Sequence, residues 1–136
     1  AVFTLLQDYR GPTMLEPAQV IEIFAKSPDI KTLPADTVIF EAGQEGEVMY
    51  GVIEGEVTLQ VQGQVVETIR AGDVFGEGAL VQIPPLRATT AVAQTDCRLA
   101  AVDASHFKFL VQETPLFALE VIRSLSTRLR AFKATE

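Results

Sequence analysis

An acidic and a basic side chain, Glu77 and Arg87, lie in a segment, residues 72–91, that interrupts an otherwise regular pattern of strands. The run Phe75-Gly76-Glu77-Gly78, followed by Ala79-Leu80-Val81-Gln82, predicts a glycine turn that opens a short helix. Unpaired N–H groups at a helix start carry partial positive charge and attract anions. A guanidinium can hold a phosphate through two parallel hydrogen bonds, whereas a carboxylate accepts hydrogen bonds from hydroxyl groups. These residues together predict a site for a sugar phosphate.

The same segment resembles the phosphate-binding cassette of cyclic-nucleotide-binding domains, a family that includes catabolite-activator proteins and the regulatory subunits of protein kinase A. The family pattern is Phe-Gly-Glu-x-Ala-Leu, a short gap, and Arg-x-Ala-Ser/Thr. Here it reads Phe75 to Leu80 and then Arg87-Ala88-Thr89-Thr90, with Thr89 in place of the usual alanine. Residues 49–57 resemble the strand–glycine–strand signature of the family, and the likeness extends from Leu15 to Lys133.

The resemblance implies a cyclic purine nucleotide as ligand, and cAMP is favoured over cGMP because Ala88 follows the arginine. It implies that Glu77 accepts a hydrogen bond from the ribose 2′-hydroxyl and that Arg87 pairs with the cyclic phosphate. The base is expected against Val65, Leu80 and the following helix. The predicted ligand-binding residues are Phe75, Gly76, Glu77, Gly78, Ala79, Arg87, Ala88, Thr89 and Thr90, with Phe132 as a candidate lid over the purine.

Composition excludes several other classes of function. The chain has 136 residues, of which 48% are hydrophobic, which suits one domain with a core. Its net charge of −7 argues against direct binding of nucleic acid. A single histidine, His106, and a single cysteine, Cys97, exclude the usual zinc sites and catalytic triads, so we expect no metal, no cofactor and no enzyme. No apolar run could span a membrane, and we expect a soluble, cytoplasmic protein with Cys97 in its core.

The elements that must position the site follow from the hydrophobic pattern. Pro17 and the apolar residues after it predict a short helix that ends by Pro28. Alternating β-branched and aromatic residues predict strands over residues 37–40, 49–53, 57–61, 65–69, 89–93 and 97–102. Gly43, Gly46, Gly55, Gly63 and Gly72 fall between strands, where we expect them to supply positive φ angles. The expected fold is mainly β with flanking helices, a jelly-roll-like β-roll (double-stranded β-helix) with an N-terminal helix, a short cassette helix and a long C-terminal helix.

The C-terminal helix carries a seam of apolar residues. Asp103 and Thr114 are predicted caps for two successive helices, and the second runs to about Phe132 without glycine or proline. Ala118, Ile122, Leu125, Leu129 and Phe132 follow a heptad spacing. This seam either packs on the chain's own roll or forms a parallel homodimer through Ile122, Leu125, Leu129 and Phe132.

We expect residues 1–14 to be an N-terminal extension, which need not be native, and residues 15–136 to form the binding domain with its C-terminal helix. Because no helix-turn-helix pattern follows that helix, the sequence favours a stand-alone sensor that repositions the helix to signal to a downstream protein. Two alternatives stay open. One is an interaction or dimerisation module of the same fold that binds no nucleotide, and the other is a truncated part of a transcriptional regulator.

Overall fold

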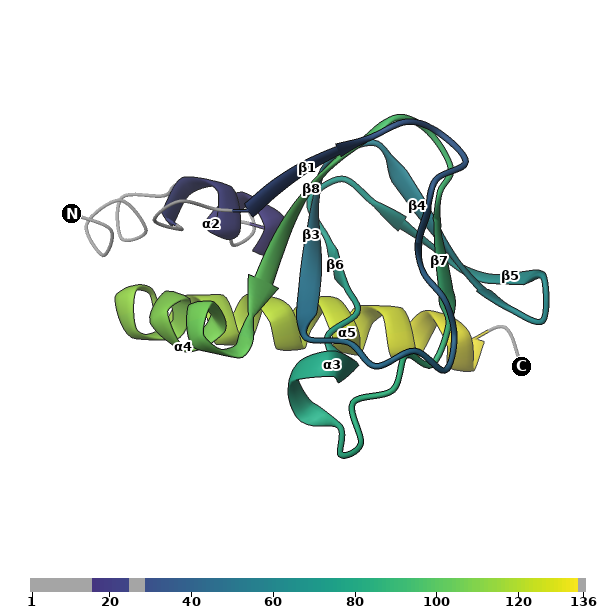
Figure 1. Ribbon diagram of the computed structural model, residues 1–136. Coiled ribbons are helices and arrows are strands. Elements are labelled where there is room, and N and C mark those ends of the chain that lie inside the picture. The colour runs from purple at the N-terminus through teal and green to yellow at the C-terminus, as the bar shows by residue number, and fades with distance from the viewer. Residues whose placement is uncertain (1–15, 25–28, 135–136) are drawn as a thin grey trace.

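Two antiparallel sheets of four strands each form the body of the computed structural model, which describes residues 16–24 and 29–134. The first sheet has the order β1 (Asp29–Leu33), β8 (Cys97–Asp103), β3 (Val48–Glu54) and β6 (Val74–Phe75). The second has the order β2 (Val38–Phe40), β7 (Thr90–Ala93), β4 (Glu56–Val61) and β5 (Gln64–Arg70). Figure 1 shows the strands wrapped into a roll, so the predicted β-roll is confirmed.

The space between the sheets is filled by a core of alternating residues from both. Tyr50 and Leu99 of the first sheet meet Phe40 and Leu59 of the second, and all four are buried. The rings of Tyr50 and Phe75 stack with centroids 5.3 Å apart, and the ring of Phe40 lies 6.0 Å from that of Phe75. Cys97 is buried in this core as predicted.

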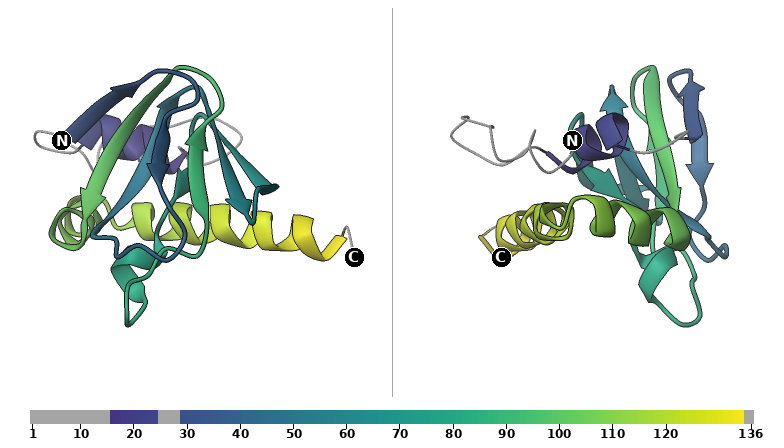
Figure 2. Two further views of the ribbon diagram at one scale, coloured as in Figure 1. Left: turned by 45° about the vertical axis from the view of Figure 1, so that its right-hand side comes forward. Right: turned by 90° about the vertical axis from the view of Figure 1, so that its left-hand side faces the viewer.

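The opposite face of the first sheet carries the helices. Met49, Ala100 and Val102 alternate with the residues of the inner core and point outward, as the pleat of a strand requires. They pack against α2 (Pro17–Phe24), α4 (Ala104–Glu113) and α5 (Leu116–Ala134) in a second core of buried residues: Val20, Ile21, Val74, Leu110, Phe117 and Val121. Figure 2 shows α5 crossing the lower end of the strands as the longest helix.

The six predicted strands are confirmed with boundaries that differ by at most one residue. Two strands were not predicted. β1 is a half-polar edge strand in which Asp29 and Lys31 hide the alternation, and β6 has only two residues. The helix predicted from Pro17 is confirmed as far as Phe24, and residues 25–28 lie outside the described residues.

The two predicted caps differ in how they act. The Asp103 side chain accepts a hydrogen bond from His106 N at 2.8 Å and caps α4 as predicted. At the start of α5, Phe117 N donates to the Thr114 carbonyl at 2.9 Å. The Thr114 hydroxyl is buried and has no partner among the described residues, so the backbone caps this helix.

Candidate functional site

A hollow of about 480 Å³ opens between the second sheet and α3 (Gly78–Val81), the short helix predicted after the glycine turn. Its walls come from five elements and the two loops around α3. The lining residues are Phe40, Leu59, Glu67, Gly76, Glu77, Gly78, Ala79, Gln82, Pro84, Leu86, Arg87, Ala88, Thr89 and Arg128. All predicted ligand-binding residues line the hollow except Phe75, which is fully buried in the inner core, and Thr90.

Thr90 is turned toward a neighbouring loop. Its hydroxyl accepts a hydrogen bond from Ala42 N at 3.0 Å. Thr89, the residue that departs from the family pattern, lines the hollow instead. Of the two threonines, Thr89 therefore lies at the site, and Thr90 does not line it.

Arg87 forms the floor of the hollow and is only 8% exposed. Its Nη1 donates to the Gly76 carbonyl at 3.0 Å, and its Nη2 donates to the Val48 carbonyl at 2.8 Å. The guanidinium carbon lies 4.1 Å from the centre of the Phe40 ring, which supports it by a cation–π contact. Burial lowers the pKa of Arg87, and the nearby Tyr50 and Glu77 oppose this shift. A guanidinium nevertheless stays charged in proteins, so the hollow has a fixed cation at its base.

A turn on the neighbouring loop holds the backbone of Arg87 in place. Arg87 N donates to the Gln44 carbonyl at 2.7 Å, and Gly43 N donates to the Arg87 carbonyl at 2.8 Å. Gly46 lies so close to the guanidinium that a side-chain carbon there would overlap its central carbon. The expectation of a positive φ is met at Gly43, Gly55, Gly63 and Gly72, whereas at Gly46 the requirement for glycine is one of space.

Glu77 lies at the first turn of α3 and is half-buried. Its Oε1 is buried and has no hydrogen-bond partner among the described residues, and the same holds for Nε of Arg87. Buried polar atoms are nearly always paired, so each unpaired atom calls for an explanation. The residues that carry this unpaired acceptor and donor, Glu77 and Arg87, both line one hollow. A ligand with a hydroxyl and an anionic group has the partners that the two side chains lack.

The predicted amide donors of α3 are partly engaged within the protein. Ala79 N points to the Gly76 carbonyl at 3.3 Å, a long hydrogen bond, and Leu80 N donates to the Glu77 carbonyl at 3.0 Å. The amide of Ala79 could thus exchange a weak internal partner for a stronger anionic one.

Sequence reasoning missed the far wall of the hollow, which is an ion pair between a strand and a helix. Arg128 of α5 binds Glu67 of β5 through Nε at 2.6 Å and Nη2 at 3.2 Å, and its Nη1 donates to the Val74 carbonyl at 2.6 Å. Burial would lower the pKa of Arg128, but the hydrogen bond to Glu67 and the charges of Glu67, Asp73 and Glu77 raise it overall. Because Glu67 and Arg128 lie 61 residues apart, no local pattern could have paired them.

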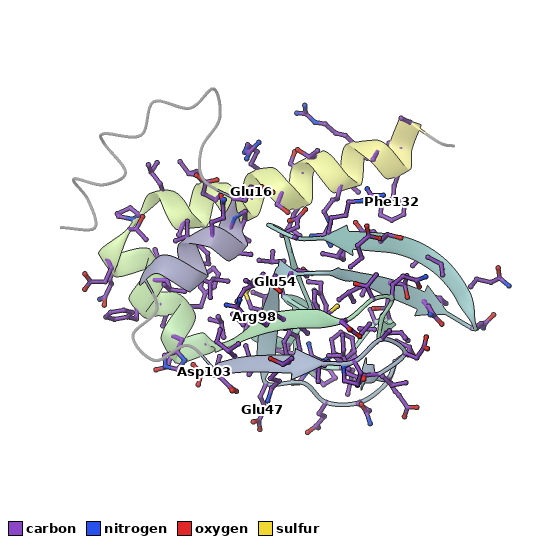
Figure 3. The ribbon with its side chains drawn as sticks, turned by 90° about the horizontal axis from the view of Figure 1, so that it is seen from above. Glu16, Glu47, Glu54, Arg98, Asp103 and Phe132 are labelled. Atoms are coloured by element: carbon purple, nitrogen blue, oxygen red, sulfur yellow. The ribbon has the colours of Figure 1, made fainter. Side chains whose placement is uncertain are left out.

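Three residues expected near the base lie elsewhere. Phe132 lines a second hollow of about 350 Å³ between β5 and the end of α5, which shares Glu67 and Arg128 with the first. Figure 3 shows Phe132 near the end of α5, on the side that faces β5. Leu80 lines a third hollow between α3, α4 and α5, and Val65 is exposed on β5.

The profile of the cyclic nucleotide-binding domain matches residues 30–114, which include every residue of the predicted cassette and both sheets except Asp29, the first residue of β1. The chain belongs to the cyclic nucleotide-binding domain family. Glu77 and Arg87 therefore lie inside the family domain, whereas Arg128 lies beyond the matched residues.

Relatives of this cyclic nucleotide-binding domain occur in several kinds of protein. It is 26% identical to the cAMP-activated global transcriptional regulator CRP of Pasteurella multocida, over 81% of this chain and 55% of that protein. It is 37% identical to the cAMP-dependent protein kinase regulatory subunit of Candida albicans, over 74% of this chain and 24% of that protein. The chain thus spans about half the length, or less, of these curated relatives.

Solved structures show the same fold. The catabolite activator protein of Thermus thermophilus superposes with a TM-score of 0.70 and 25% identity, over 96% of this domain and 60% of that chain. A protein from a cyclic-GMP-dependent signalling pathway of bacterial phytopathogenesis superposes with a TM-score of 0.68 and 25% identity, over 84% of this chain and 94% of that one.

Within residues 16–24 and 29–134, no cluster of histidine, cysteine or acidic side chains could bind a metal ion. Across those same ranges, none of the helices combines the length and the apolar character that a membrane crossing needs. The arrangement suits reversible binding of an anion that also carries a hydroxyl.

Proposed function

We propose that the chain is a cyclic nucleotide sensor that binds cAMP and signals by repositioning α5. The observation that carries this proposal is that Arg87 and Glu77, whose buried Nε and Oε1 have no hydrogen-bond partner among the described residues, line a single hollow. A cyclic purine nucleotide has the two groups that these atoms require, a phosphate diester and a 2′-hydroxyl. The domain acts as a non-catalytic regulatory module in the cytoplasm.

Each end of the ligand has its own contacts in this proposal. Arg87 and the amides of Gly76, Gly78, Ala79 and Ala88 bind the phosphate, and Thr89 adds a hydroxyl. Glu77 accepts the ribose 2′-hydroxyl. The base lies toward Leu59, Glu67 and Arg128, where the hollow continues.

Helix α5 is the element that would carry the signal. Arg128 lies both in the wall of the hollow and in the bonds that fix α5 to β5 and β6. A ligand that binds one position of α5 more tightly than another shifts the helix toward that position. Phe132, one turn beyond Arg128, would then cover the base as a lid, because its own hollow adjoins the first.

Helix α5 also provides a surface for a homodimer. Ile122 is 60% exposed and Leu129 is 54% exposed, so this part of the heptad seam does not pack on the chain's own roll. Leu125 is half-buried against the second core. We propose that Ile122, Leu125, Leu129 and Phe132 form a parallel seam with a second copy, from which the signal passes to a downstream protein.

Calorimetric titration of the purified chain with cAMP and with cGMP tests the proposed ligand. Removal of the Arg87 guanidinium leaves the buried phosphate without its partner, which costs about 2–5 kcal/mol, or roughly 30-fold to several-thousand-fold in affinity. Arg87→Ala should therefore lose cAMP binding, and Arg70→Ala, which removes an exposed arginine that does not line the hollow, should not. Equal affinity in Arg87→Ala and the unchanged chain would refute the assigned role.

The same titration separates cAMP binding from two other candidates. The likeness to a protein from a cyclic-GMP-dependent pathway makes cGMP the second candidate ligand, and tighter binding of cGMP would establish it. A dimer that binds neither nucleotide would instead support the interaction module, for which the exposed seam on α5 is the specific observation. A third candidate is a part of a transcriptional regulator, because the chain resembles about half of one. Such a part would also bind cAMP, so the reading frame that encodes the chain, followed beyond Glu136, separates it instead.

A further inference from the structure

Glu120 is a buried carboxylic acid at the junction of two helices. It lies on α5 and is 1% exposed, although α5 runs along the molecular surface. The neighbouring positions Phe117 and Val121 belong to the second core, which also contains Val20 and Ile21 of α2. Helix α2 thus packs on the part of α5 that carries Glu120.

No described residue neutralises this carboxyl group by a hydrogen bond. Its Oε2 is buried and has no hydrogen-bond partner. The nearest cation is Nη2 of Arg123, which lies 3.9 Å from Oε2 and belongs to a side chain that is 45% exposed. This separation is too long for a hydrogen bond, and solvent weakens the attraction. An ionised carboxylate in this place would therefore be poorly compensated.

A second carboxylate near Glu120 makes its ionisation harder. Glu16, at the start of α2, brings a second carboxylate that acts on Glu120, and Figure 3 shows it where α2 meets α5. The turn between β5 and β6 contributes Asp73, which accepts a hydrogen bond from Ser124 of α5, one turn beyond Glu120. Among the described side chains, Arg123 is the only cation that acts on this group.

Helix α4 contributes apolar contacts to the same core. Phe107 packs on Phe117 with ring centroids 5.3 Å apart, and Leu110 is fully buried. The charged or titratable residues of α4, His106, Lys108 and Glu113, are exposed.

Burial, helped by Glu16 and opposed by Arg123, raises the pKa of Glu120 to about 7.

We propose that Glu120 makes the packing of α2 on α5 sensitive to pH: the neutral acid lets the helices pack, and its ionisation loosens α2. Below neutral pH the group holds a proton and no charge is buried. Above neutral pH a negative charge would remain between the helices next to Glu16, and opening the junction lets water solvate it. The proposal concerns the free chain and does not require that it bind a nucleotide.

Hydrogen exchange of the ligand-free chain tests the proposal directly. Protection factors of α2 amides, corrected for intrinsic exchange, should fall about tenfold between about pH 6 and about pH 8, as expected for a group with a pKa near 7 that returns to its ordinary value on opening. Glu120→Gln keeps the shape of the neutral acid, so its protection factors should not change over this range. Glu113→Gln, which alters an exposed glutamate of α4, should behave as the unchanged chain.

A titration of the side-chain carboxyl carbons by ¹³C NMR gives a second measurement on the unchanged chain. One signal should titrate near neutral pH and be absent in Glu120→Gln, and Glu16→Gln should move its midpoint to lower pH. A Glu120 signal that titrates near its ordinary value of 4.5 would overturn the proposal. The same conclusion would follow if α2 protection changed with pH equally in Glu120→Gln and the unchanged chain.

Discussion

Arg87 has a fixed position before any ligand arrives. Two backbone carbonyls accept from its Nη atoms, the Phe40 ring lies beneath it, and Gly46 leaves room beside it. Such an arrangement removes the need to order a flexible side chain on binding, which otherwise costs affinity. The position of Arg87 therefore depends on Gly46, a residue that does not line the hollow.

Gly46→Ala tests this dependence. The new methyl group would overlap the guanidinium and must displace it, because the backbone at Gly46 does not need a positive φ. We expect cAMP affinity to fall at least tenfold while the fold is retained, as measured by calorimetry and circular dichroism. The control is Glu45→Ala, which truncates an exposed side chain in the same turn and should bind as the unchanged chain does. Full affinity in Gly46→Ala would show that the position of Arg87 is not set in this way.

At the scale of elements, polar contacts fix the second half of α5 to the roll, whereas Phe117 and Val121 pack its first half in the second core. Arg128 bonds to Glu67 of β5 and to the Val74 carbonyl of β6, and Ser124 bonds to Asp73 between those strands. Arg128 and Glu67 are both largely buried, so their interaction is only weakly screened by solvent. The docking of the second half of α5 therefore depends on a few polar residues.

Arg128→Ala should lower the free energy of unfolding by about 2–4 kcal/mol, since it leaves Glu67 and the Val74 carbonyl without their partner. Urea unfolding measures the loss. Arg130→Ala, at an exposed position of the same helix, should change stability by less than about 0.5 kcal/mol. If the two variants were equally stable, the ion pair would not hold α5 in place.

The elements could be predicted from sequence where the alternation of residues is regular, as in β4 and β8. β1 could not, because as an edge strand it exposes most of its residues and carries charge on them. In the site, Glu77 and Arg87 form a local motif, whereas Glu67 and Arg128 meet only after the roll has closed and α5 has docked. Pairings of this kind depend on tertiary structure and leave no local pattern.

For the whole molecule, the stability of the fold should depend on pH near neutrality. The pKa of Glu120 is about 7 in the folded chain and should return toward 4.5 on unfolding, so the folded chain binds a proton that the unfolded chain releases. The contribution of Glu120 to the free energy of unfolding is fully present below about pH 4.5, declines as the pH rises through about 7, and then levels off. The difference in unfolding free energy between the unchanged chain and Glu120→Gln, measured across this range, should follow that curve. A constant difference would contradict it.

A homodimer through the apolar seam of α5 is also a property of the whole molecule. Leu129→Asp places a charge in the exposed part of the α5 seam and should convert a dimer into a monomer, as measured by sedimentation. Ser105→Asp puts the same charge at an exposed position on α4 and should leave the molecular mass of the dimer in sedimentation unchanged. An unchanged dimer in Leu129→Asp would place the interface elsewhere.

The burial of Arg87 has a consequence for the response to ionic strength. Salt screens charges on the surface strongly and charges in the interior weakly, so added salt should hardly weaken the attraction between Arg87 and an anion in the hollow. The chain as a whole carries a net charge of −7 and repels anions at a distance, and salt reduces that repulsion. Nucleotide affinity should therefore stay level or rise slightly with salt, whereas a site built from surface cations would lose affinity.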